Sequence, residues 1–246
     1  MVSSACVGRK DDPEPGTETG PVVVPGGGDE GTAFFHRTLV LEFTGTWCQY
    51  CPMMAAALEE AKGLRPGRLV EIAVHGYDEM SADEAEALAG RFKVSGYPSV
   101  VFDLDAGTKF GEHEASKFTN YVDAAANQAC GLALDASNGR LTVKVKAVSG
   151  GQYSIGLAVV EDGIVAYQTG YGEGYVNNAV LRRFLSEGLD GDSLGELSEG
   201  EERSVEYECS LTPAQRVVAY VLQDGKSINA LSCGPGEVID YTYEEN

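Results

Sequence analysis

Residues 32–130 alternate between apolar runs and segments whose apolar positions have helical spacing. The runs at 35–44, 69–74, 99–104 and 109–113 predict strands. The helical patterns are at 52–62, at 116–128, and at 81–92, where Ser81-Ala82-Asp83-Glu84 reads as a capping box. The order strand, helix, strand, helix, two strands, helix predicts an α/β domain with a central sheet.

Residues 131–246 carry shorter apolar runs and little helical signal. Strands are expected at 141–147, 153–161, 164–168, 204–209, 217–222 and 228–232. Asp162-Gly163 and Asp224-Gly225 mark tight turns between them. This half is therefore predicted to be an all-β, immunoglobulin-like sandwich.

Residues 1–31 are predicted to form a flexible tether, because 7–31 are polar, acidic and rich in glycine and proline. Small residues precede Cys6 in Ser3-Ser4-Ala5-Cys6, as at the end of a bacterial lipoprotein signal. We expect Cys6 to carry a lipid that anchors the chain to a membrane. The alternative is an unmodified cysteine in a floppy N-terminus.

Charge and composition narrow the range of partners. The chain has 246 residues, 43% of them hydrophobic, and a net charge of −20. A nucleic-acid partner is not expected, because phosphate binding needs a basic face. No apolar run approaches the roughly 20 residues of a membrane-spanning helix.

The segment Trp47-Cys48-Gln49-Tyr50-Cys51-Pro52 carries the clearest chemistry. It joins a predicted strand to a predicted helix, and the turn brings two thiols within disulfide range. Unpaired N–H groups at the helix N-terminus favour the thiolate of Cys48. Zinc sites use the same spacing but need two further ligands, and no second pair is present. We therefore expect no metal and no cofactor.

Residues 32–130 resemble the thioredoxin superfamily. The resemblance rests on the Trp47–Pro52 segment, on Gly96-Tyr97-Pro98 directly before the third strand, and on the order of the elements. The resemblance implies a cis Tyr97–Pro98 bond facing the dithiol, against an ordinary trans proline as the alternative. It also implies that Glu42 is buried below the disulfide and relays a proton. The alternative is that Glu42 faces solvent by strand alternation, since Leu41 and Phe43 share the other face.

The implied mechanism is thiol–disulfide exchange with protein thiols or disulfides. Cys48 is the exposed nucleophile and Cys51 resolves the mixed disulfide. The Tyr97–Pro98 backbone pairs with the substrate strand. The intervening Gln49-Tyr50 matches neither the reducing nor the strongly oxidising members of the superfamily, so the direction stays open.

A second resemblance covers nearly the whole chain. It rests on sequence segments of the second half, namely 160–168 with 177–182, and 217–221. They are similar to the twenty-eight-kilodalton outer-membrane lipoproteins of Bacteroidetes-type bacteria. This resemblance implies a periplasmic or surface lipoprotein. Two functions follow: a tethered thiol–disulfide oxidoreductase, or a non-catalytic surface binding protein on a thioredoxin-like scaffold. The intact cysteine pair favours the first.

Other residues offer weaker hypotheses. Among Cys130, Cys209 and Cys233 an oxidising compartment permits one disulfide, with Cys209–Cys233 favoured and Cys130–Cys233 close behind. Tyr167, Tyr171 and Tyr175 flank a glycine-rich loop and could bind a glycan or a peptide. The alternative is that they cap the sandwich edge or touch the other domain. The histidines, His36, His75 and His113, are expected to be surface or hydrogen-bonded residues.

Overall fold

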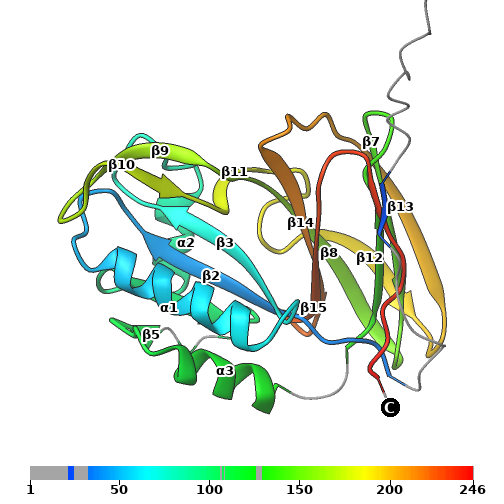
Figure 1. Cartoon of the computed structure of the whole chain (residues 1–246). Helices are drawn as coiled ribbons and strands as arrows, with labels where there is room; N and C mark the ends of the chain where they lie inside the picture. The colour runs from blue at the N-terminus through cyan, green and yellow to red at the C-terminus, as the bar shows by residue number, and fades with distance from the viewer. Residues whose placement is uncertain (1–21, 25–32, 106, 108, 126–128, 246) are drawn as a thin grey trace, which may run out of the picture.

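The computed structural model describes residues 22–24, 33–105, 107, 109–125 and 129–245. Its first half has the predicted order of strands and helices (Figure 1). The strands are β2 (Thr38–Thr44), β3 (Leu69–His75), β4 (Ser99–Phe102) and β5 (Lys109–Phe110). The helices are α1 (Cys51–Leu64), α2 (Ala85–Arg91) and α3 (Ala115–Ala124).

Helices cover both faces of this sheet, which explains why its central strands read as nearly continuous apolar runs. Val40 of β2 faces a core with Met54 and Leu58 of α1 and Phe118 of α3. Leu41 of β2 faces the opposite core, which includes Leu88 of α2. Strand β2 runs parallel to β3 and antiparallel to β4, as the thioredoxin-like fold requires.

The second half is the expected β-sandwich. Its strands are β6 (Gly131–Asp135), β7 (Arg140–Lys146), β8 (Gly151–Glu161), β9 (Ile164–Gln168), β10 (Gly172–Asn177), β11 (Val180–Phe184), β12 (Asp192–Leu197), β13 (Glu202–Glu208), β14 (Gln215–Gln223), β15 (Lys226–Cys233) and β16 (Glu237–Ile239). Apolar side chains of β6 and β7 pack against those of β8, β12, β14 and β15 in one core. This packing confirms a strand-rich second half.

One layer of the sandwich is continuous with the thioredoxin-like sheet. The strands lie in the order β15-β14-β8-β11-β3-β2-β4-β5, and Val180 of β11 pairs with Ala73 of β3. One core also spans the two halves, since it holds Ile72 of β3, Val160 of β8 and Tyr220 of β14. The two halves therefore form one packed body with a shared sheet.

Several details differ from the sequence-based expectations. Neither the shared sheet nor strands β6, β10, β11, β12 and β16 were predicted. Helix α2 begins at Ala85 without a side-chain cap, because Ser81 Oγ accepts a hydrogen bond from the Asp78 N–H instead. The prediction of a capping box at 81–84 is therefore wrong. Within the predicted tether, strand β1 (Val22–Val24) pairs in parallel with β16. The rest of 1–31, including Cys6, lies outside the described residues. Among the described helices, none has the length and apolar character needed to cross a bilayer.

Candidate redox site

The Cys48–Cys51 pair forms a disulfide at the start of α1. The two Cα atoms are 5.5 Å apart, within the normal range for a disulfide. The chain reaches this position because β2 ends at Thr44 and a short loop leads to Cys51, the first residue of α1. Pro52 lies in the first turn, where its missing N–H costs no helical hydrogen bond.

Cys48 is far less accessible than the sequence suggested. Its side chain and backbone together are only 4% exposed, and Cys51 is 1% exposed. The expectation of an exposed Cys48 is therefore wrong for the disulfide form. Its neighbours Trp47 and Tyr50 are exposed by 46% and 60%, so the disulfide lies just beneath the molecular surface. A reaction partner must approach through this thin cover.

The Tyr97–Pro98 peptide bond is cis, as predicted. Phe43 of β2 pairs with Ser99 of β4, and this antiparallel register places Pro98 opposite Thr44, where the redox loop begins. The Pro98 carbonyl already accepts the Gly111 N–H at 3.0 Å. Pairing with a substrate strand would therefore depend on the Tyr97 backbone.

An aromatic cluster lies beside the redox loop. The ring of Trp47 packs against those of Tyr97 and Tyr77, with centroids 5.3 and 6.5 Å away. The indole Nε1–H of Trp47 donates to the Gly76 carbonyl at 2.8 Å. A Cβ at Gly76 would lie 2.5 Å from the Tyr97 hydroxyl, so this close approach requires glycine. Trp47 therefore shields one side of the loop in a fixed orientation.

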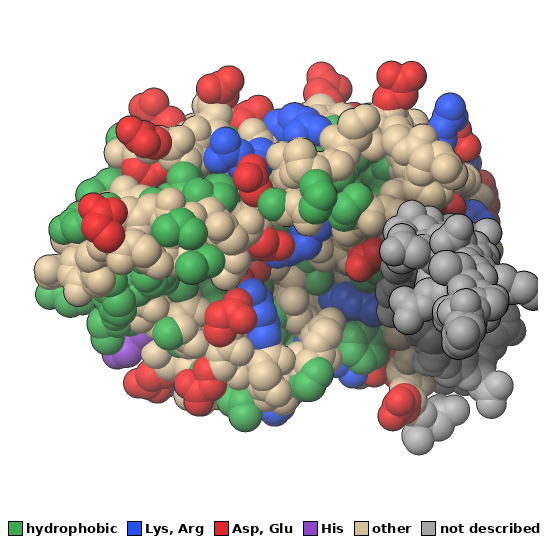
Figure 2. All heavy atoms as spheres, turned by 45° about the horizontal axis from the view of Figure 1, so that its top comes forward, with side chains coloured by type: hydrophobic (Ala, Val, Ile, Leu, Met, Phe, Trp, Pro, Cys, Tyr) green, Lys and Arg blue, Asp and Glu red, His purple; other side chains and the backbone are tan. Residues whose placement is uncertain are grey.

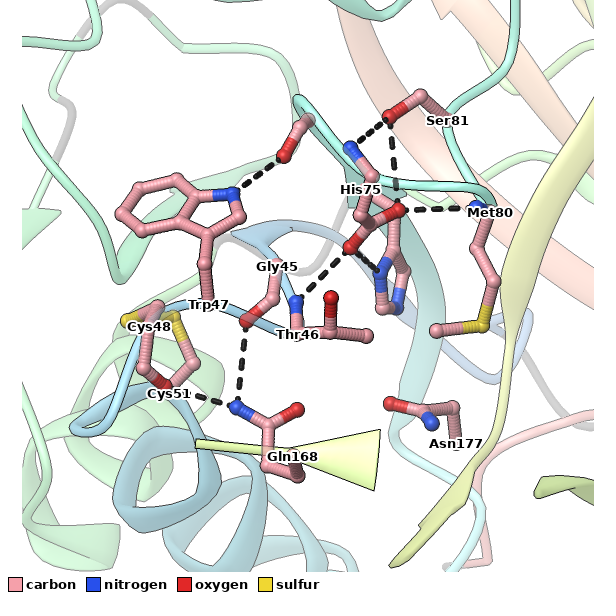
Figure 3. Close-up of polar contacts among 12 residues, drawn as sticks. Gly45, Thr46, Trp47, Cys48, Cys51, His75, Met80, Ser81, Gln168 and Asn177 are labelled. Atoms are coloured by element: carbon pink, nitrogen blue, oxygen red, sulfur yellow. Dashed lines mark hydrogen bonds and ion pairs between the residues drawn. A yellow bond between two sulfur atoms is a disulfide. The ribbon is translucent and has the colours of Figure 1, made fainter. Parts of the chain in front are cut away.

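The other side of the loop is held by the hairpin of β9 and β10. Gln168 Nε2 donates to the carbonyls of Gly45 and Cys48 at 3.2 and 2.8 Å (Figure 3). The Thr169 N–H donates to the Thr46 carbonyl at 2.8 Å. Gln168 is 2% exposed, so these bonds are sheltered from water. The second half of the chain thus clamps the cysteine loop.

A buried carboxylate fixes the loop from below. Asp78 accepts hydrogen bonds from the Thr46 N–H at 2.8 Å and from His75 Nδ1 at 2.9 Å (Figure 3). Burial raises the pKa of Asp78, but these hydrogen bonds outweigh burial and leave the pKa below its usual value. His75 is thus a buried, hydrogen-bonded residue, and its partner is Asp78.

Glu42 is buried, as the thioredoxin resemblance implied, and the solvent-facing alternative is wrong. It is 2% exposed, and it lines a cavity together with Cys51 and Glu71. Burial raises the pKa of Glu42 well above its usual value, and the nearby charge of Glu71 raises it further. A raised pKa makes the Glu42 carboxylate a stronger base than an ordinary carboxylate, as a proton relay to a thiol needs.

The three tyrosines of the glycine-rich region do not act as one group. Tyr171 and Tyr175 contact each other edge to face, with centroids 5.7 Å apart, and both line the cavity beside Cys51. Tyr167 is 53% exposed and does not line it. Tyr171 and Tyr175 thus lie against the first half of the chain, which agrees with the alternative that they touch the other domain.

The expected second disulfide does not form. Cys130, Cys209 and Cys233 are all free thiols in the apolar core of the sandwich. The Cys233 sulfur contacts the carbonyl of Glu237 at 3.4 Å instead. Burial raises the pKa of Cys233 to about 12, with a further contribution from the charge of Glu237. These cysteines behave as small hydrophobic residues.

Sequence analysis missed the residues that hold and surround the cysteine loop from a distance. Gln168 ended a predicted strand but gave no sign of its target 120 residues earlier. Glu71 was detectable, because it interrupts an apolar strand just as Glu42 does. The parallel register pairs Glu42 with Ala73 and Glu71 with Val40, which puts both carboxyls on the face covered by α1.

The fold and the paired cysteines define a thioredoxin-like protein. Residues 32–124 match the thioredoxin family, which agrees with the cis-proline and the disulfide. Residues 85–237, more than half of the chain, match the outer membrane protein Omp28 family, and the chain belongs to that family. This membership indicates a location in the bacterial cell envelope.

Solved structures support the fold over most of the chain. HBP35 of Porphyromonas gingivalis has a TM-score of 0.69 at 19% identity, covering 87% of this chain and 80% of that one. A protein of Agrobacterium tumefaciens has a TM-score of 0.62 at 12% identity, covering 85% and 97%. At these identities the likeness concerns the fold alone. No curated protein matches the chain.

Proposed function

We propose that this protein is an extracytoplasmic thiol–disulfide oxidoreductase, tethered to the outer membrane through a lipid on Cys6. The observation that carries the proposal is the Cys48–Cys51 disulfide at the start of α1, on the same sheet edge as the cis Tyr97–Pro98 bond. The Omp28 family match supports the envelope location. Periplasm and cell surface both fit this assignment.

The exchange reaction uses only the two thiols and a substrate disulfide. The Cys48 thiolate attacks one substrate sulfur, the substrate S–S bond breaks, and one substrate thiolate leaves. The Cys51 thiolate then attacks Cys48, releasing the second substrate thiol and closing the 48–51 disulfide. The substrate gains two electrons, and a dithiol reductant must restore the pair. In the reverse direction the pair oxidises a substrate dithiol.

The Glu42 carboxyl supplies the proton step. It lines the same cavity as Cys51, so a proton can pass between them directly or through water. In its carboxylate form Glu42 takes the proton of Cys51 as that sulfur attacks, and the resulting carboxylic acid returns the proton to Cys51 when the dithiol forms again. The backbone of Tyr97 aligns the substrate strand next to Cys48.

The test is catalysis by the full chain of insulin reduction by dithiothreitol, together with oxidation of a reduced dithiol peptide. Acceleration of either reaction that disappears in Cys48→Ser supports the proposal. Cys130→Ala, in which the changed thiol is remote from the loop, is the matched control and keeps the wild-type rate. Equal rates for wild type and Cys48→Ser in both assays would contradict it.

The second candidate is a non-catalytic binding lipoprotein, and the shielding of Cys48 favours it. In that case the disulfide is a structural brace, and recognition of a glycan or peptide falls to Tyr167, Tyr171 and Tyr175. Tyr167 and Tyr171 are more than half exposed on the hairpin, as binding aromatics need to be. Loss of ligand binding in Tyr167→Ala with unchanged redox behaviour would select this alternative.

A further inference from the structure

A cavity of about 390 Å³ adjoins the disulfide on the side away from Trp47. Its floor comes from β2 and β3, one wall from α1, and the roof from the hairpin of β9 and β10 (Figure 1). Cys51 lies on its lining, together with Gln168 of the clamp. Thiol exchange at Cys48 does not require a space of this size, so the cavity calls for its own explanation.

The floor of the cavity presents hydrogen-bond acceptors. Glu42 Oε1 is buried and has no hydrogen-bond partner within the described part of the chain. Glu71 is 7% exposed and pairs with Lys62 at 2.5 Å. Lys62 also pairs with Glu59 at the cavity rim. The carboxylates of Glu59 and Glu71 outnumber the Lys62 ammonium, so the floor keeps a net negative charge.

The roof and wall add aromatic and aliphatic surfaces. Tyr171 and Tyr175 contact each other edge to face, and ring faces attract organic cations. The carboxyls of Glu42 and Glu71 lie near enough to Tyr175 to raise its pKa, after burial, to about 12. The wall carries short aliphatic groups from α1: Pro52, Met53, Ala55 and Ala56. Such a wall accommodates methylene groups.

We propose that this cavity binds an aliphatic primary ammonium group, either a lysine side chain of a partner protein or a free diamine. The ammonium donates to Glu42 Oε1 and approaches Glu71, while the hydrocarbon chain lies between α1 and the tyrosines. An anion is disfavoured by the net negative floor. A metal ion is disfavoured because the described residues offer no cluster of three or more suitable ligands. The overall charge of −20 attracts cations to the surface.

This binding is separable from the proposed redox function, because the disulfide form of the full chain cannot start an exchange with an amine. Isothermal titration calorimetry of that form compares n-butylamine with n-butanol, which has the same chain length and no charge. Saturable binding of the amine alone is expected. Two further ligands distinguish a free diamine from a lysine side chain. Tighter binding of cadaverine than of Nα-acetyl-lysine amide indicates a diamine, and the reverse order indicates a lysine side chain.

Three variants complete the test. Tyr175→Leu removes a ring face and is expected to weaken amine binding about tenfold. Glu42→Leu removes the free acceptor and is expected to weaken it at least about tenfold. Val165→Ala changes an exposed residue of the same hairpin outside the cavity and keeps wild-type affinity. Tyr175→Leu decides the matter if Glu42→Leu does not fold.

The proposal is overturned if n-butanol binds as well as n-butylamine, because the cavity is then merely apolar. It is also overturned if the amine shows no saturable binding, or if Tyr175→Leu binds it with unchanged affinity. None of these results bears on insulin reduction. Failure of the cavity assignment and failure of the redox assignment can therefore be told apart.

Discussion

The chain holds two sets of cysteines, and their surroundings differ although both sets are buried. Cys48 and Cys51 flank a helix start just under the surface and form a disulfide. Cys130, Cys209 and Cys233 lie in the core of the sandwich as free thiols with raised pKa values. The candidate redox pair therefore differs from the core cysteines in two ways: it lies at a helix N-terminus, and it lies near the carboxyl of Glu42.

The comparison also shows what the second half of the chain does for the first. The same strand-rich half that buries three thiols extends a hairpin over the redox loop and fixes it through Gln168. Hydrophobic side chains gather over the end of the molecule that carries this hairpin, whereas acidic side chains are scattered across the whole visible face (Figure 2). An element distant in sequence thus holds the loop that carries Cys48.

The largest expected effect separates the two sets by function. Cys48→Ser should reduce catalysed exchange to the background rate, because the attacking sulfur is gone. Replacing Cys130, Cys209 and Cys233 together by alanine should leave the rate within about twofold but lower the free energy of unfolding, because core volume is lost. Insulin reduction and urea denaturation measure the two quantities. An equal fall of the exchange rate in both variants would show that the Cys48–Cys51 pair has no special role in the reaction.

The next effect concerns thiol reactivity. Because the pKa of Cys233 is raised to about 12, its thiolate fraction at neutral pH is about a thousandfold below that of an ordinary thiol. In the reduced native protein, iodoacetamide should label Cys48 within minutes and the core thiols only on unfolding. Mass spectrometry of the labelled peptides over time gives the rates. Comparable labelling of Cys233 and Cys48 would show that the position at the helix start does not make Cys48 more reactive than a core thiol.

A smaller effect tests the hairpin clamp. Gln168→Leu leaves the buried carbonyls of Gly45 and Cys48 without their donor, which favours opening of the hairpin by about 1 kcal/mol or more. Reduction of the disulfide by dithiothreitol should then be about threefold to tenfold faster. Gln152→Leu, on an exposed position of β8, is the matched control and should keep the wild-type rate. A rate unchanged in Gln168→Leu would mean that the hairpin does not limit access.

The smallest effect is the pH dependence contributed by Glu42. Its pKa is raised in the folded state, so the stability it contributes is complete below the ordinary carboxyl pKa and is lost as pH rises through the folded value. Glu42→Gln lacks this loss. Relative to wild type, the variant should gain about 1 kcal/mol or more in free energy of unfolding between pH 5 and pH 8. Urea denaturation of the disulfide form measures it.

The control for this pH effect is Glu60→Gln, which changes an exposed carboxylate on α1. Its stability should follow wild type across the same pH range. If Glu42→Gln also follows wild type, Glu42 is ionised in the folded protein and cannot act as a proton donor to Cys51.

Local patterns predicted the parts of the site that depend on neighbouring residues. The cysteine spacing predicted the disulfide, and the resemblance to the thioredoxin superfamily implied the cis-proline before β4 and the buried Glu42. The structure confirms all three. The hydrogen bonds from Gln168 and the free state of the core thiols could not be predicted from short stretches of sequence, because both depend on contacts between distant segments. The shared sheet was missed for the same reason, since it depends on the pairing of Val180 with Ala73.

The redox potential of the Cys48–Cys51 pair decides most directly whether the pair is a working dithiol or a brace. Equilibration with glutathione buffers, acid quenching and mass spectrometry of the alkylated peptides give the oxidised fraction. We expect a reversible two-electron transition with a midpoint between about −120 and −270 mV, the range of exchange-active pairs. A disulfide that stays closed below about −300 mV, as structural disulfides do, would contradict the redox function.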